Sequence, residues 1–190
     1  MNRIAMARPS WDQEMRQAAL DTLDSLHWVK GPQGKAFGKE FSAYSDAVQG
    51  TPCQSGSVAL WAALRLLDIG PGDEVLVPSL TYIATATCVS LCGATPVFVD
   101  VEPSYWCVDL ASMEAARTPR TKAVIAVHLF GQMCDDDLVE WCEEHGIAYI
   151  EDAAQAHGAV AGDGRKAGGV GDVACFSFFP SKNLAVGGEG

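Results

Sequence analysis

Short apolar runs rich in β-branched residues alternate along the chain with segments in which apolar residues recur every three or four positions. The first pattern is typical of buried strands, and the second of helices that pack on one face. Their alternation predicts an α/β fold with a mostly parallel sheet and helices on both faces. The predicted strands are 74–77, 96–99, 123–128, 148–151 and 173–176, and the predicted helices between them are 58–67, 83–91, 110–116 and 136–145.

Two further helices are predicted upstream, at 11–26 and 37–47, joined by a glycine-rich turn from Lys30 to Gly34. No repeat or linker divides the chain, so we expect one α/β domain. Within it we predict an N-terminal helical segment over 1–48 that packs on a large domain over 49–190.

The composition is that of an ordinary globular protein: 190 residues, 48% hydrophobic and 19% charged, are enough for one sizeable core. A net charge of -11 with only 13 Lys and Arg argues against a nucleic-acid surface. No stretch approaches the roughly twenty apolar residues of a membrane span. The start of the sequence also lacks the apolar centre and cleavage pattern of a signal peptide. We therefore expect a cytoplasmic protein with neither a membrane nor a nucleic-acid partner.

Seven cysteines with irregular spacing and no Cys-x-x-Cys pair indicate neither a disulfide framework nor a zinc site. Cys88 and Cys92 would share a helix face, but they have no nearby histidine or acid pair, which favours packing over metal binding. Glu151, Asp152 and His157 provide too few ligands for a metal. We predict no metal site.

Ligands of such sheets bind beyond the carboxyl ends of the strands. Glu151 and Asp152 end an apolar strand, where a buried charge is costly unless it is paired or hydrogen-bonded. Because strand side chains alternate, only one of these acids faces the crevice easily. Asp152 offers an anion for the ring nitrogen of a bound cofactor, and Gln155 nearby offers an amide for a phenolic oxygen on the same ring.

Lys182 follows the last predicted strand and has apolar neighbours on its N-terminal side. Such a setting suits an amine nucleophile, because burial disfavours the ammonium form. A carboxylate that keeps a pyridine nitrogen protonated is the second requirement of pyridoxal phosphate chemistry, and Asp152 could supply it. The two residues therefore indicate a cofactor aldehyde bound to Lys182 with an aspartate behind the ring.

Two further segments are candidates for the site. Gly56 and Ser57 open a helix whose free N–H groups suit a phosphate, although serine and glycine there are more often simple caps. Tyr82 follows the strand 74–77 and could stack on a planar cofactor, although a single tyrosine is more often a core residue. His128 and His157 are more often hydrogen-bonded scaffold at such positions. A Rossmann dehydrogenase or a P-loop NTPase is disfavoured, because neither glycine motif is present.

The sequence resembles the DegT/DnrJ/StrS sugar aminotransferases, which are pyridoxal-phosphate enzymes of the aspartate-aminotransferase fold (fold type I). The likeness covers nearly the whole chain. It is carried by 70–75, 77–79, 93–100, 118–123 and 127–132, and most specifically by 151–159 and 176–184.

The resemblance implies pyridoxal 5'-phosphate as the cofactor and assigns a role to each candidate. Lys182 would form the Schiff base and Asp152 would pair with the pyridine nitrogen, and these two are the catalytic residues. The remaining contacts would be Gln155 to the ring oxygen, Gly56, Ser57 and Ser177 to the phosphate, and Tyr82 on the ring face. Ser57 stands where threonine is usual and keeps the hydroxyl. The lysine at 182, where dehydratase members have histidine, favours transamination.

By the same resemblance, an amino acid, glutamate in most relatives, would donate the amino group to a nucleotide-linked keto-sugar, and the full-length protein would be a homodimer. Three alternatives stay open: a regulatory or binding protein that keeps the cofactor fold, an inactive fragment, and a relative that aminates cyclitols or forms aromatic amines. In the family the chain continues for about as long again, with a strand that inserts into the sheet and a small C-terminal domain. We therefore expect the 190-residue chain alone to be unstable or aggregation-prone.

Overall fold

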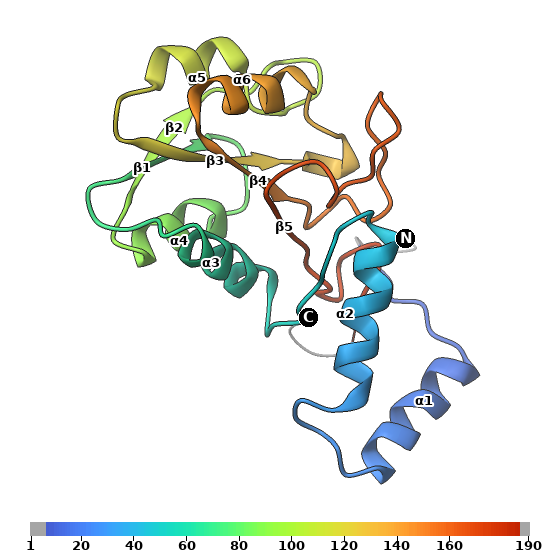
Figure 1. Cartoon of the computed structure of the whole chain (residues 1–190). Helices are drawn as coiled ribbons and strands as arrows, with labels where there is room; N and C mark the ends of the chain where they lie inside the picture. Colours follow the sequence, from blue (N-terminus) through green and yellow to red (C-terminus); the bar gives the residue numbers. More distant parts are fainter. Residues whose placement is uncertain (1–6, 187–190) are drawn as a thin grey trace, which may run out of the picture.

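The fold, seen in a computed structural model that describes residues 7–186, is built on five parallel strands (Figure 1). The strands are β1 (Glu74–Pro78), β2 (Thr95–Val99), β3 (Thr121–Val127), β4 (Ala148–Asp152) and β5 (Val173–Cys175), in the spatial order β2-β1-β3-β4-β5. The helices are α1 (Gln13–Asp24), α2 (Pro32–Tyr44), α3 (Gly56–Leu66), α4 (Ala84–Leu91), α5 (Leu110–Ala116) and α6 (Asp137–His145), with a short 3-10 turn η1 (Leu129–Gly131). The strand order reverses between β1 and β3, and a ligand crevice is expected at the carboxyl ends beside such a reversal.

Alternating side chains divide the core into two layers. Val75, Val77 and Ile125 pack with buried residues of α3 and α4 on one face of the sheet. Leu76 and Val124 pack with buried residues of α5 and α6 on the other. Figure 1 shows the same arrangement, with α3 and α4 on one side of the sheet and α5 and α6 on the opposite side. The predicted mostly parallel α/β fold with helices on both faces is confirmed.

The predicted turn from Lys30 to Gly34 is wrong, because α2 already begins at Pro32. Gly31 is its N-cap, and a proline in the first turn loses no helical hydrogen bond. Gly34 therefore lies inside the helix. At the other end, α2 stops at Tyr44 instead of Ala47.

Aromatic side chains connect α2 to the segment after β5. The ring centroid of Phe41 lies 4.8 Å from that of Phe176, and the centroid of Phe37 lies 5.0 Å from that of Phe178. In contrast, α1 has no buried residue. The division into an N-terminal segment over 1–48 and a large domain over 49–190 stays a prediction.

None of the helices within residues 7–186 is both long and apolar enough to cross a membrane. Within those residues β5 also lies at one edge of the sheet, beside a groove of about 470 Å³ that β5 and residues 48–53 line. The insertion of a further strand into the sheet, and the instability expected without it, stay predictions.

Glu151 is a fully buried carboxylate that ties β4 to the loop before β5. It accepts hydrogen bonds from the N–H groups of Gly168 (2.9 Å), Val170 (2.9 Å) and Gly171 (2.8 Å), and its other polar contact is His128 Nε2 at 3.0 Å. Burial raises the pKa of Glu151, but the hydrogen bonds outweigh burial, so the net pKa is lowered. The carboxylate therefore stabilises the folded state in its ionised form.

Replacing this carboxylate tests its structural role. We expect Glu151→Gln to lower the free energy of unfolding at pH 7 by about 2–4 kcal/mol, because an amide cannot accept all of these hydrogen bonds. Since the folded pKa is depressed, the stabilisation is present above the ordinary value of 4.5 and is lost as the pH falls through the folded pKa. The difference in free energy of unfolding between wild type and variant, measured by urea unfolding, should therefore become smaller as the pH falls below about 4.

Glu144→Gln is the matched control, because Glu144 is exposed on α6. Equal stability of Glu151→Gln and wild type at neutral pH would show that the buried carboxylate does not hold the loop.

Candidate active site

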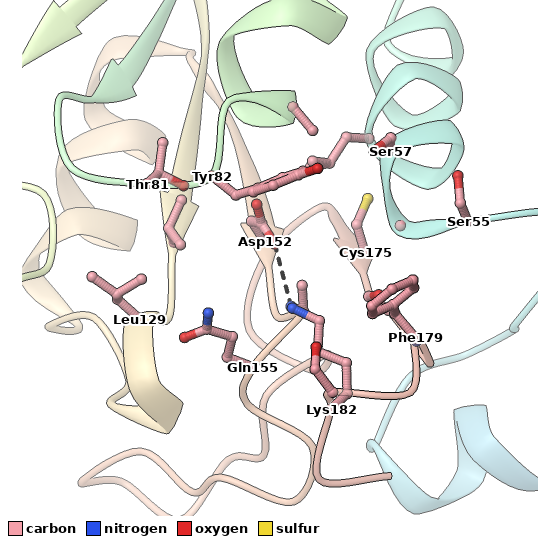
Figure 2. Close-up of a pocket in the computed structure, with 17 residues that line it drawn as sticks. Ser55, Ser57, Thr81, Tyr82, Leu129, Asp152, Gln155, Cys175, Phe179 and Lys182 are labelled. Atoms are coloured by element: carbon pink, nitrogen blue, oxygen red, sulfur yellow. Dashed lines mark hydrogen bonds between the residues drawn. The ribbon is translucent and has the colours of Figure 1, made fainter. Parts of the chain in front are cut away.

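A pocket of about 360 Å³ lies where the carboxyl ends of β4 and β5 meet the N-terminus of α3 (Figure 2). Its wall includes all seven residues predicted for the cofactor site: Gly56, Ser57, Tyr82, Asp152, Gln155, Ser177 and Lys182. The fold thus brings together residues that are far apart in the sequence. Their individual roles stay predictions.

Asp152 ends β4 on the face opposite Glu151, as strand alternation predicts, and is only 6% exposed. Its Oδ1 accepts the N–H of Ala154 at 3.2 Å, and its Oδ2 accepts the hydroxyl of Thr85 at 3.1 Å. Burial raises the pKa of Asp152, while these hydrogen bonds and the charge of Lys182 oppose that rise. A cationic group placed in the pocket would therefore be stabilised by this carboxylate.

Lys182 lies in a turn after β5 and directs its amine toward Asp152 in Figure 2. The backbone N–H of Lys182 donates to the backbone carbonyl of Phe179 at 2.8 Å. Next to it, the amide of Asn183 donates to the carbonyl of His157 at 3.1 Å. The turn thus places a half-buried primary amine at the wall of the pocket.

The N-terminus of α3 opens onto the same pocket. Ser55 is its N-cap, and the Ser55 hydroxyl accepts the N–H of Val58 at 3.3 Å. The N–H groups of Gly56 and Ser57 have no hydrogen-bond partner within residues 7–186. Together with the Ser57 hydroxyl, they form a place for an anionic group.

Gly56 and Ser177 are in close contact. A Cβ atom added at Gly56 would lie 2.9 Å from Cβ of Ser177, which is too close for two carbon atoms. Ser177 is itself buried. Because glycine has no Cβ, α3 can lie directly beside Ser177, and both residues reach the same end of the pocket.

Tyr82 and Gln155 lie on other parts of the wall. The Tyr82 side chain is 72% exposed, so one face of its ring is available to a ligand. Gln155 Oε1 accepts the N–H of Phe130 at 2.7 Å, which fixes the side chain and leaves its amide nitrogen to donate.

The two histidines considered in the sequence do not line the pocket. His128 is fully buried, and its Nδ1 accepts the N–H of Cys134 at 3.2 Å, so the proton is on Nε2, which faces Glu151. His157 packs among phenylalanine rings, with centroids 5.3 Å from Phe176. Among residues 7–186, no three His, Cys, Asp or Glu side chains are grouped as a metal site requires.

Thr85 is the residue of this site that the sequence did not reveal. It lies in the first turn of α4, fully buried, and donates to Asp152. A threonine inside an apolar helix gives no pattern of its own. Its meaning becomes visible only in the fold, where the Thr85 hydroxyl lies against Asp152 and against the hydroxyl of Thr81.

The polar groups of the pocket fit pyridoxal phosphate. A buried carboxylate that lacks a full counter-charge, Asp152, suits a protonated ring nitrogen. The amine of Lys182 suits an aldehyde, and the unpaired N–H groups at the start of α3 suit a phosphate. The three groups line one cavity.

Comparison with known proteins identifies the family of the chain. Residues 9–190 match the DegT/DnrJ/EryC1/StrS aminotransferase family. A relative from Acidithiobacillus ferrooxidans, named UDP-N-acetyl-3-dehydro-alpha-D-glucosamine 3-aminotransferase, is 50% identical over 169 residues, which are 88% of this chain and 46% of the relative.

Two solved structures have the same fold. The S. venezuelae protein DesV, in complex with a ketimine intermediate, matches with a TM-score of 0.89 and 46% identity, over 93% of this chain and 47% of that chain. The PLP form of the Streptococcus pneumoniae protein Spr1654, described as a sugar aminotransferase, matches with a TM-score of 0.90 and 31% identity, over 97% of this chain and 51% of that chain. This chain therefore spans about half the length of the relatives it matches. It belongs to the DegT/DnrJ/EryC1/StrS aminotransferase family.

Proposed function

We propose that the protein is a pyridoxal-phosphate-dependent aminotransferase that moves an amino group from an amino acid, glutamate first among them, to a nucleotide-linked keto-sugar. The observation that carries the proposal is the meeting of Lys182 and Asp152 in one pocket with the open N-terminus of α3. Membership of the family supports it. The name of the A. ferrooxidans relative supports a nucleotide-sugar acceptor. A cytoplasmic homodimer is part of the same proposal.

In this proposal the phosphate binds at the start of α3. The N–H groups of Gly56 and Ser57 donate to it, and the hydroxyls of Ser57 and Ser177 add two further donors. Positive potential at a helix N-terminus favours this anion. The close contact of Gly56 with Ser177 supports the assignment, because it brings both segments to one end of the pocket.

Other residues of the wall would hold the ring. Asp152 would pair with the ring nitrogen and hold a proton on it, and the amide N–H of Gln155 would donate to the ring oxygen. Tyr82 covers a face of the ring. When bound, pyridoxal phosphate supplies an aldehyde carbon that amines attack and a cationic ring that delocalises the electron pair left by deprotonation.

Lys182 has two tasks in the proposal. Its Nζ would be the nucleophile that holds the cofactor. The same Nζ would act as a general base that takes the proton from the α-carbon of the amino donor. Positioned proton transfer of this kind contributes about 10²–10⁴-fold to the rate. Asp152 supports this step, because its negative charge keeps the ring nitrogen protonated.

The first test replaces the amine. We expect Lys182→Ala to lower transamination of a keto-sugar by glutamate by at least about 10²–10⁴-fold, because nucleophile and base are lost together. Lys122→Ala is the matched control, since Lys122 is exposed on β3 outside the pocket. Transamination by Lys182→Ala at the wild-type rate would refute the assignment.

The visible spectrum of the wild type with pyridoxal phosphate separates an enzyme from a binding protein. An enzyme should show an absorbance band that shifts when glutamate is added. A band that glutamate leaves unchanged would favour a regulatory binder. Cyclitol and keto-sugar acceptors, offered in parallel, distinguish the acceptor classes.

The second test concerns the phosphate end. Gly56→Ala should weaken binding of pyridoxal phosphate about tenfold or more, because the added methyl group overlaps Ser177 and moves it. Absorbance titration with the cofactor measures the dissociation constant. Gly34→Ala is the matched control: its Cβ would meet no atom within 4 Å, and alanine favours the helix. Unchanged affinity of Gly56→Ala would contradict a phosphate site at this helix end.

A further inference from the structure

The carboxylate of Asp152 has two hydrogen-bond donors of different kinds. Oδ1 accepts from the backbone N–H of Ala154 at 3.2 Å. Oδ2 accepts from the hydroxyl of Thr85 at 3.1 Å. Thr85 is therefore the side chain that donates directly to this buried acid.

The hydroxyl of Thr85 is part of a chain of two threonines. It lies 2.9 Å from the hydroxyl of Thr81, and it is fully buried. Because its single hydrogen goes to Asp152, the hydrogen between the two threonines comes from Thr81. Both hydroxyl dipoles therefore point toward the carboxylate. Thr81 itself lies at the wall of the pocket, where Figure 2 labels it.

The other titratable groups around Asp152 come from four elements. The charge of Lys182, after β5, favours the carboxylate, and His128, after β3, would favour it if its ring were protonated, whereas the thiols of Cys88 on α4 and Cys175 on β5 would oppose it if they ionised. Burial raises the pKa of Cys88 to about 11 and that of Cys175 still higher, so both thiols are neutral at physiological pH.

We propose that Thr85, supported by Thr81, is a positioning residue that holds Asp152 ionised and fixes its carboxylate toward the pocket. The proposal rests on the proposed function for its purpose, because only an ionised Asp152 can keep the cofactor nitrogen protonated. The physical reason is that hydroxyl donors stabilise a carboxylate, whereas burial favours the neutral acid. Without the hydroxyl of Thr85, one hydrogen-bond donor fewer stabilises the ionised form of Asp152 against the effect of burial.

Thr85→Val removes the hydroxyl and keeps the shape, and Thr85→Ser keeps the hydroxyl and removes the methyl group. The first readout is the titration of the Asp152 carboxyl carbon by NMR in the cofactor-free protein. We expect Thr85→Val to move this titration upward by about one pH unit, because the ionised form loses a donor. Thr85→Ser should titrate close to the wild type.

The second readout is the affinity for pyridoxal phosphate across pH. Thr85→Val should bind about tenfold more weakly near neutral pH. The acid limb of its binding curve should lie at higher pH, since a higher pH is needed to ionise Asp152. Thr87→Val is the matched control, because Thr87 is exposed on the same helix and does not line the pocket.

An Asp152 titration in Thr85→Val that equals the wild type would overturn the proposal. An equal loss of affinity in Thr85→Ser would also overturn it, since the methyl group would then be what matters. If Thr85→Val does not fold, Thr81→Val gives the test. A smaller upward shift of the Asp152 titration supports the proposal, and no shift overturns it. A wild type that fails to bind pyridoxal phosphate would refute the proposed function, while the carboxyl titration would still test Thr85.

Discussion

Two adjacent buried acids at the end of β4 are the constraint on which the rest of this structure depends. Strand alternation sends Glu151 and Asp152 to opposite faces of the sheet. Burial disfavours the charge of both carboxylates, but their surroundings differ. Glu151 has three backbone N–H donors as well as His128, and its pKa is lowered, whereas Asp152 has two donors, and its pKa is raised. The first acid is satisfied by the scaffold, and the second needs a cation from the pocket.

This difference links the scaffold to the site. The loop that Glu151 holds leads directly into β5, and the segment after β5 carries Ser177 and Lys182. The aromatic contacts of α2 pack against the same segment through Phe176. The turn that presents the amine of Lys182 is therefore fixed by contacts outside the pocket. Proximity and orientation of this kind are what a positioned nucleophile requires.

The sequence predicted the part of the fold that depends on local patterns. The five strands follow from short apolar runs between helical segments, and the orientation of Glu151 and Asp152 to opposite faces follows from their adjacent positions at a strand end. The sequence misplaces the start of α2, because glycines around a proline are typical of a turn, whereas a proline in the first turn is also compatible with a helix. Thr85 was missed because its meaning depends on a contact with Asp152, 67 residues away in the chain. The roles of the individual site residues rested on the family resemblance, since spacing alone does not distinguish a phosphate site from a simple helix cap.

The central claim is that Lys182 is the amine that binds the cofactor. Borohydride reduction of the protein with pyridoxal phosphate, followed by proteolysis and mass spectrometry of the peptides, tests it most directly. The account predicts a stable secondary amine between the cofactor and Nζ of Lys182, lost in Lys182→Ala. Labelling of a different lysine, or no labelling of a protein that binds the cofactor, would contradict it.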